Sequence, residues 1–91
     1  LLPPTPGIRI TQSDGAVYIS WGQMQDEDVT VKISRSEPGT KPVLAGTAEG
    51  GSDFFIDKNV SKGKLYFYQL SSVNKNNKEG ALSEKVGIRL Q

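Results

Sequence analysis

Apolar and polar residues alternate along most of the chain, in short runs separated by turn-forming residues. The clearest run covers residues 29–35, where Val29, Val31 and Ile33 face one side and the polar residues between them face the other. Alternation with a period of two is typical of a β-strand with one buried face, and no stretch keeps the spacing of an amphipathic helix. The pattern therefore predicts an all-β domain.

Six further strands are predicted from the same pattern. Residues 8–11 and 17–21 flank the turn formers Ser13, Asp14 and Gly15, and would form a hairpin. The proline-containing loop 37–42 leads into a weak edge strand at 43–47, because proline is not tolerated in a central strand. The remaining strands are predicted at 53–57, 66–73 and 85–90. Seven short strands at this spacing favour a two-sheet β-sandwich over a barrel that encloses a ligand.

The expected core follows from the faces of these strands. Val17, Ile19 and Trp21 share one face of the second strand, while Tyr18 points the other way. On the longest strand one face carries Tyr66, Tyr68, Leu70 and Ser72, and on the last strand the inward face carries Val86, Ile88 and Leu90. The run at 54–56 is apolar throughout, so its pattern leaves open which of Phe54 and Phe55 points outward.

Composition narrows the range of functions that the chain could have. The chain has 91 residues, of which 35% are hydrophobic, which fits one ordinary globular domain with room for a core but not also for a deep substrate cavity. Its 11 basic and 10 acidic residues give a net charge of +1, which does not favour nucleic acid as a partner. No apolar run is long enough to span a membrane.

Cysteine and histidine are both absent. Their absence removes disulfides, thiolate nucleophiles, Cys/His zinc sites and a Ser-His-Asp triad. We therefore expect a domain without catalytic residues and without a cofactor.

Three features together resemble a fibronectin type III domain, and the resemblance covers nearly the whole chain. Prolines precede the first strand, and a lone Trp21 ends the apolar face of the second. The segment 60–74 is similar to the family pattern Leu-x-Pro-x-Thr-x-Tyr-x-Val-x-Val-x-Ala-Val-Asn, with Tyr66 at its tyrosine. Its departures from the pattern include Val60, Lys62, Lys64 and Ser72. The two lysines constrain the backbone of the turn before the longest strand less than the residues of the family pattern do.

The resemblance implies a seven-stranded, immunoglobulin-like sandwich. In such a fold Trp21 would fill the space between the sheets, and Tyr66 would form a tyrosine corner by hydrogen bonding to backbone near Val60. Residues 1–7 would be the end of a proline-rich linker, and residues 8–91 the module itself.

The sequence looks more like bacterial than animal versions of the domain. Such modules accompany catalytic and carbohydrate-binding modules in secreted polysaccharide-degrading enzymes such as cellulases. The resemblance therefore implies an extracellular spacer that contacts neighbouring modules of its own chain, and we expect it to be a monomer.

Exposed aromatic residues are the candidates for an interface. Four residues could contribute to one, namely Tyr18, Phe54, Phe55 and Phe67. Packing against an adjoining module is the favoured interpretation, since exposed apolar patches usually mark interfaces. Incidental exposure is one alternative. Stacking on a polysaccharide is the other, which would make the domain an accessory carbohydrate-binding module.

Two loops carry further candidate chemistry. Asp26, Glu27 and Asp28 could supply oxygen ligands to Ca²⁺, but they lack the spacing of an EF-hand loop, so a solvated loop is favoured. The polar loop 74–80 occupies the hairpin that carries an Arg-Gly-Asp tripeptide in some animal relatives, and that tripeptide is missing here. A protein-binding or adhesion module of a cell-surface protein is the remaining alternative.

Overall fold

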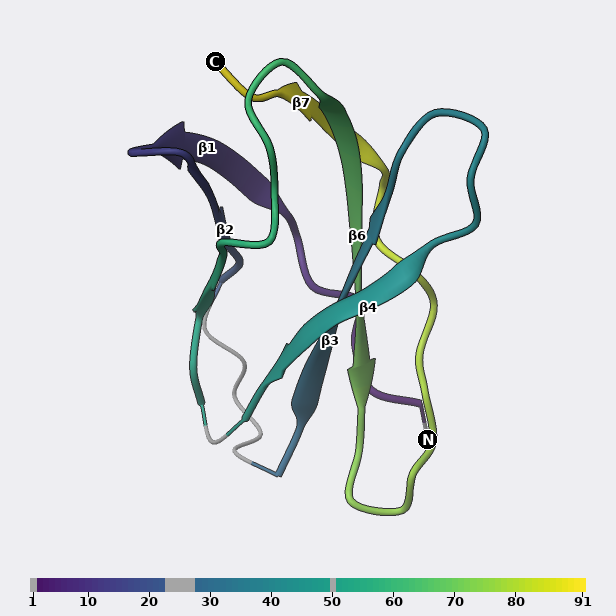
Figure 1. Ribbon diagram of the computed structural model, residues 1–91. Helices are drawn as coiled ribbons and strands as arrows, with labels where there is room; N and C mark the ends of the chain where they lie inside the picture. Colours follow the sequence, from purple (N-terminus) through teal and green to yellow (C-terminus); the bar gives the residue numbers. More distant parts are fainter. Residues whose placement is uncertain (1, 23–27, 50) are drawn as a thin grey trace.

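Seven strands form two antiparallel sheets that face each other in the computed structural model, which describes residues 2–22, 28–49 and 51–91 (Figure 1). The strands are β1 (Arg9–Ser13), β2 (Ala16–Ser20), β3 (Thr30–Ser36), β4 (Val43–Ala48), β5 (Phe54–Asp57), β6 (Leu65–Val73) and β7 (Val86–Arg89). The prediction of an all-β, two-sheet sandwich is confirmed. Ile8 and Trp21, predicted within strands, lie just before β1 and just after β2. Across the described ranges, no helix is long and apolar enough to cross a membrane.

The two sheets meet at two flanks. One sheet has the order β1-β2-β5, and the other has the order β4-β3-β6-β7. The outer strands β4 and β5 contact each other at one flank, and β1 and β7 contact each other at the opposite flank. The face of each sheet that turns toward the other supplies the core.

The hairpin between β1 and β2 sets the register of the smaller sheet. Ser13 lies opposite Ala16, so only Asp14 and Gly15 make the turn, and their φ angles are 52° and 78°. Two successive positive φ angles are what a two-residue hairpin turn requires, and glycine adopts them without steric cost. The resulting register buries Val17 and leaves Tyr18 on the outer face.

Side chains from both sheets interdigitate in one core. Trp21 is 4% exposed, and its indole Nε1 donates a hydrogen bond to the Ser52 carbonyl at 3.1 Å. Its backbone N–H donates to the Asp53 carbonyl at 3.0 Å, which extends the contact between β2 and β5 by one residue. The other large buried residues include Val17, Ile19, Val31, Ile33, Tyr66, Tyr68, Leu70 and Leu90.

The inward face of β5, which the sequence leaves open, consists of Phe55 and Asp57. Phe55 packs against the core, Asp57 is 2% exposed, and Phe54 points outward with 57% of its surface exposed. Phe55 is thus removed from the set of outward aromatics.

The ring of Phe55 closes the flank between β4 and β5. It lies directly against Gly46 of β4, where a Cβ atom would overlap it. Gly46 is therefore needed for the close approach of the two outer strands.

The two ends of the described chain lie at opposite ends of the sandwich (Figure 1), whose dimensions are 40 × 26 × 17 Å. Near the first end, Pro6 is buried and Thr5 Oγ1 donates to the Ala81 carbonyl at 3.2 Å. Near the last end, Gln12 Nε2 donates to the Arg89 carbonyl at 2.8 Å, and Gln12 Oε1 accepts from the Gln91 N–H at 2.6 Å. Both terminal segments are thus held by side-chain hydrogen bonds to the body of the domain.

Candidate functional site

A cluster of three polar side chains crosses the interior between the sheets. Asp57 Oδ2 accepts hydrogen bonds from Arg35 Nη1 on β3 and from the Tyr68 hydroxyl on β6, each at 2.7 Å. Asp57 Oδ1 accepts from the backbone N–H of Asn59 at 3.1 Å. A buried carboxylate is tolerated when it is paired and fully hydrogen bonded, and Asp57 meets both conditions. The cluster links β5 of one sheet to β3 and β6 of the other.

The pKa values of the cluster follow from these contacts. Burial, followed by the hydrogen bond to Asp57, raises the pKa of Tyr68 far above its ordinary value, because both disfavour the phenolate. For Arg35, burial works against the charged form, but the hydrogen bond and charge of Asp57 outweigh it and raise the pKa. Tyr68 therefore stays protonated and Arg35 stays charged at physiological pH, which fits a structural role.

The residues expected in the core lie between the sheets or against them. Tyr66 is buried, and its hydroxyl accepts a hydrogen bond from the Ser61 N–H at 2.7 Å, while Val60 packs against the core. Trp21, Tyr68 and Leu70 are buried between the sheets. The hydroxyl of Tyr66 thus fixes the loop between β5 and β6, five residues upstream of the ring.

Two of the four candidate interface residues come together on one face. Tyr18 lies opposite Ile56, and Ser20 lies opposite Phe54, so Tyr18 and Phe54 are diagonal neighbours on the outer face of the β1-β2-β5 sheet. Tyr18 is 37% exposed. We refer to Tyr18, Phe54 and Ile56 as the outer aromatic patch.

Phe67 lies elsewhere and is half-buried. On the outer face of the other sheet it lies opposite Gly87, and its ring contacts the space that a side chain at that glycine would fill. Lys85 Nζ stands 5.6 Å from the centre of the ring, within the range of a cation–π contact. Phe67 and Phe55 are therefore used in packing within the domain.

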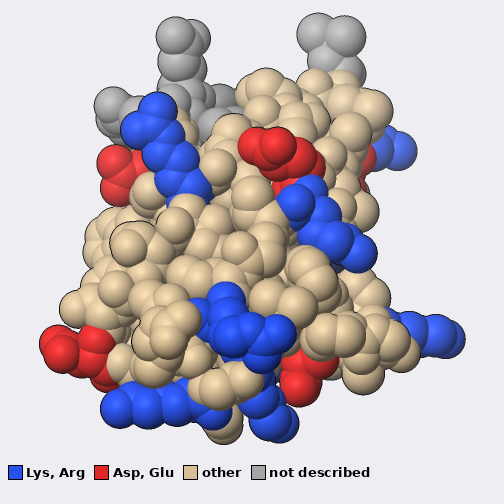
Figure 2. Space-filling model, turned by 90° about the horizontal axis from the view of Figure 1, so that it is seen from above, with Lys and Arg blue, Asp and Glu red and all other residues tan. Residues whose placement is uncertain are grey.

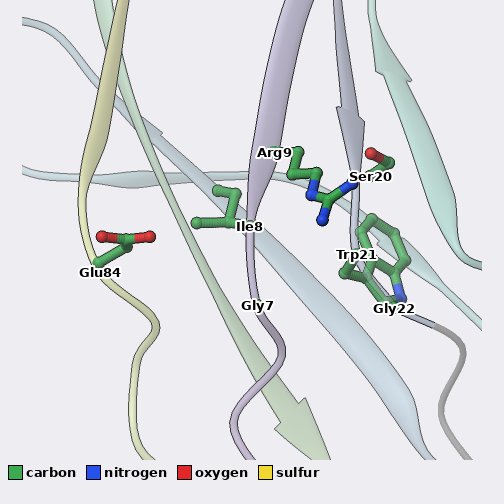
Figure 3. A pocket seen from close by; sticks show the side chains of 7 residues that line it. All are labelled: Gly7, Ile8, Arg9, Ser20, Trp21, Gly22 and Glu84. Carbon is green, nitrogen blue, oxygen red and sulfur yellow. The ribbon is translucent and has the colours of Figure 1, made fainter.

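A shallow hollow lies where β1 begins and β2 ends. Its volume is about 490 Å³, and Ile8, Arg9, Trp21 and Glu84 contribute side chains to it. Figure 3 shows Glu84 and Trp21 on opposite sides, with Ile8 between them. Trp21 is almost completely buried, so it presents little of its ring to a sugar in the hollow.

Basic side chains are spread over the end of the molecule that carries the loop between β5 and β6. Figure 2 shows that acidic side chains lie among them on this face. One such pair is Lys64 Nζ and Glu37 Oε1, which are 3.5 Å apart. The face thus presents mixed charge instead of one continuous basic patch.

The loop 74–80 is ordered by its own hydrogen bonds. Asn74 Oδ1 accepts from the N–H groups of Asn76 and Lys78, each at 3.0 Å. Glu79 accepts a hydrogen bond from Ser71 Oγ at 2.7 Å and pairs with Lys32 at 3.1 Å. These two contacts lower the pKa of Glu79 below its ordinary value.

The candidate calcium ligands Asp26 and Glu27 lie outside the described residues, and Asp28 is exposed. Within residues 2–22, 28–49 and 51–91, no three acidic side chains gather closely enough to hold a metal ion. The calcium hypothesis therefore stays a prediction from the sequence.

The sequence predicts Tyr68 as a core residue, but it does not predict the cluster that Tyr68 forms with Arg35 and Asp57. A signal was present, because Arg35 continues the inward alternation of Val31 and Ile33, and Asp57 occupies the next inward position after Phe55. Opposite charges at core positions of two strands predict that the strands lie close together, since each charge needs a partner when buried.

Comparison with known proteins gives a clear result for the fold. No family model matches the sequence, and no curated protein matches it. Among solved structures, a Fn3-like protein from Clostridium thermocellum matches with a TM-score of 0.71 and 21% identity, over 97% of this chain and 91% of that chain.

Two polysaccharide-active proteins contain a similar domain. A β-1,2-glucanase from Parabacteroides distasonis matches with a TM-score of 0.83 and 18% identity, over 99% of this chain and 14% of that chain. Pectate lyase PelI from Erwinia chrysanthemi matches with a TM-score of 0.77 and 15% identity, over 92% of this chain and 28% of that chain. The chain thus spans less than a third of either protein. The fold is that of a fibronectin type III-like β-sandwich.

Proposed function

We propose that this domain is a non-catalytic accessory module, which sets the distance and orientation between neighbouring modules of a larger, secreted polysaccharide-degrading protein. The observation that carries the proposal is the position of the two ends, at opposite ends of a sandwich 40 Å long. A chain that enters at one end and leaves at the other holds the modules on its two sides apart.

The hydrogen bonds at both ends support this role. Thr5 binds the Ala81 carbonyl, and Gln12 binds the backbone of Arg89 and Gln91. The chain therefore enters and leaves in fixed directions. A flexible linker of the same length would fix neither the separation nor the direction of its neighbours.

The polar groups of the interior support a non-catalytic domain. Among the described residues Asp57 is the only buried carboxylate, and its oxygens are taken by Arg35, Tyr68 and Asn59. A general acid or base needs access to a substrate, and Asp57 faces the core.

The comparisons support a polysaccharide-degrading enzyme as the parent protein. In the glucanase and in the pectate lyase, the similar region is a minor part of a longer chain. An accessory module in a secreted enzyme of the same broad class accounts for the fold, and it accounts for the similar region being a minor part of each longer chain.

The outer aromatic patch favours one second candidate, which is polysaccharide binding. Tyr18 and Phe54 are exposed side by side, next to hydroxyl-bearing residues such as Ser20 and Thr11. Aromatic rings flanked by hydrogen-bonding groups are suited to stacking on sugars.

Depletion from solution by insoluble polysaccharide separates the two functions. The purified domain is mixed with cellulose, chitin, xylan and cross-linked polygalacturonate, and the protein left in solution is measured. We expect no depletion on any of them. Depletion that Tyr18→Ala or Phe54→Ala abolishes, and that Phe67→Ala on the other sheet leaves unchanged, would replace the spacer function with carbohydrate binding through the outer aromatic patch.

A further inference from the structure

The outer edge of β7 carries basic side chains on both sides of an exposed glycine. β7 is the last strand of the four-stranded sheet, next to β6, and no strand of the described residues pairs with its far side (Figure 1). Lys85, which precedes β7, is exposed, as are Gly87 and Arg89 within the strand. Neither β6 nor β7 contains an acidic residue. The edge is therefore open and positively charged.

Three backbone groups on this edge are available to pair with another strand. The N–H of Leu90 donates to the Lys64 carbonyl at 2.9 Å, and the C=O of Leu90 accepts from the Gly63 N–H at 2.7 Å. Successive residues of a strand turn these groups to opposite sides, so those of Gly87 and Arg89 point away from β6. The Arg89 C=O is taken by Gln12 Nε2 at 2.8 Å, which agrees with this orientation. The N–H and C=O of Gly87 and the N–H of Arg89 thus face the open side of the sheet.

We propose that this edge binds an extended acidic segment of a partner protein, which pairs antiparallel with β7 and sets an apolar side chain opposite Gly87 and acidic side chains opposite Lys85 and Arg89. Adding a strand to an open sheet edge is a common mode of peptide recognition, in which backbone hydrogen bonds give affinity and alternate side chains give specificity. The recognised pattern is an apolar residue with an acidic residue two positions before it and another two positions after it.

The surface around Gly87 suits an apolar side chain. Phe67 of β6 lies opposite Gly87, and a Cβ atom at that glycine would lie 3.0 Å from Phe67 Cε1. In a strand added beside β7, the residue opposite Gly87 would point to the same outer face and lie next to this ring. An aromatic side chain beside an edge glycine supplies packing that the glycine itself lacks. The Phe67 ring therefore favours an aromatic residue at the centre of the segment.

Lys85 and Arg89 frame this apolar position and lack acidic partners. Lys85 Nζ stands 5.6 Å from the centre of the Phe67 ring, which places the ammonium group on the outer face. Arg89 Nη1 donates to the Gly63 carbonyl at 3.1 Å, and the guanidinium has four further N–H groups. Neither side chain forms an ion pair in the ranges that the structure describes. An acidic side chain opposite each of them would supply that partner.

The same charges disfavour a second copy of this chain as the occupant. Antiparallel pairing of two β7 strands about Gly87 would set Lys85 of each copy opposite Arg89 of the other, and like charges directly opposite each other are destabilising. Basic residues on an edge strand protect it from self-association in this way, while they attract a strand of opposite charge. This inference is independent of the spacer function, and it agrees with the expectation of a monomer.

A short peptide tests the pairing. The peptide acetyl-Thr-Glu-Thr-Phe-Thr-Glu-Thr-amide is titrated at low ionic strength into the isotope-labelled domain, and Kd is obtained from the backbone amide chemical shifts. We expect a Kd in the submillimolar to millimolar range, with the largest shifts at Gly87 and Arg89. Methylating the backbone nitrogen of the central Phe should raise Kd at least tenfold, because its N–H pairs with the Gly87 carbonyl. Methylating the nitrogen of the next Thr, which points away from β7, should change Kd by about twofold or less.

Charge reversal tests the two acidic positions. Lys85→Glu and Arg89→Glu should each raise Kd about fivefold, since each turns an attraction into a repulsion. Lys75→Glu, an exposed position in the loop 74–80, makes the same change in net charge away from β7 and should leave Kd within about twofold of wild type. A peptide with Lys in place of both Glu residues should bind the double variant K85E/R89E more tightly than it binds wild type.

Several outcomes would overturn the proposal. One is the absence of chemical shift changes at millimolar peptide. Others are equal effects of the two methylations, which would exclude strand pairing, and equal effects of Lys75→Glu and Lys85→Glu, which would exclude recognition of charge at this edge. Shifts confined to Tyr18 and Phe54 would place the peptide on the outer aromatic patch instead of β7.

Discussion

At the scale of single residues, the neighbours Ser71 and Ser72 on β6 differ in the hydrogen bonding of their hydroxyls. Both residues are buried, and Ser71 Oγ donates to Glu79, while Ser72 Oγ has no hydrogen-bond partner in the described part of the protein. A buried hydroxyl without a partner costs free energy, since it loses its bonds to water. Alanine, which the family pattern has at this position, avoids that cost.

Ser72→Ala should therefore increase the free energy of unfolding by about 1 kcal/mol, and Ser71→Ala should decrease it by about 1 kcal/mol. Both values come from urea unfolding of each variant beside wild type. A loss of stability in Ser72→Ala would mean that its hydroxyl has a partner after all.

Tyr68 gives a prediction for alkaline pH. Its pKa is raised in the folded protein, so the unfolded chain loses the phenolic proton first, at its ordinary pKa of about 10. Above about pH 10 the folded state then binds more protons than the unfolded state, and its stability falls as pH rises. Below about pH 10 Tyr68 makes no pH-dependent contribution.

Replacing Tyr68 by Phe should remove the part of the fall in stability above about pH 10 that comes from the Tyr68 phenol. It should also lower the free energy of unfolding at neutral pH by about 1 kcal/mol, because the hydrogen bond to Asp57 is lost. Urea unfolding from about pH 8 to 11 measures both effects. Tyr18→Phe, on the outer face, is the matched control. If the free energy of unfolding fell equally steeply with pH in wild type and in Tyr68→Phe, the Tyr68 phenol would not be the cause of the fall.

At the scale of elements, the alternation predicted each strand, but it did not predict which face of β5 points inward. Residues 29–35 and 66–73 were predicted as half-buried strands, and β3 and β6 lie within one residue of those ranges. In β5 the inward position after Phe55 holds Asp57, so hydrophobicity could not reveal the inward face. Its orientation depends on Arg35 and Tyr68, which are remote in sequence and adjacent only after the sheets have packed.

The same limit applies to the candidate site. The resemblance named Trp21 and Tyr66 because their positions match a family pattern. Which of Tyr18, Phe54, Phe55 and Phe67 are exposed together depends on the pairing of β2 with β5 and on the inward face of β5, and alternation along a single strand reveals neither.

The contact between Gly46 and Phe55 yields a prediction for the flank between β4 and β5. Gly46→Ala should lower the free energy of unfolding by about 1–3 kcal/mol, because its Cβ would overlap the Phe55 ring. In a Phe55→Leu background, the same substitution should cost much less. Gly7→Ala, where no atom lies near the added Cβ, is the control. Equal costs in both backgrounds, measured by urea unfolding, would exclude the contact as the cause.

At the scale of the whole molecule, the spacer function predicts a fixed separation between the two ends. The chain has no cysteine, so Leu2→Cys and Gln91→Cys introduce two unique labelling sites at opposite ends. Spin labels there should give one narrow distance distribution by double electron–electron resonance. A Gly/Ser chain of equal length would give a broad distribution with a root-mean-square distance of roughly 50 Å. A broad distribution for this domain would contradict the spacer function.

The bridge that Gln12 makes between β1 and β7 has a mechanical consequence. The ends of these two strands lie together at Gln12 and Arg89, while the segments that lead into them meet at Thr5 and Ala81. Tension on the two ends of the chain would therefore pull β1 and β7 past each other along their lengths. The two hydrogen bonds of Gln12 would be loaded together in shear, so the domain should resist stretching more strongly than it would if the strands could peel apart one bond at a time.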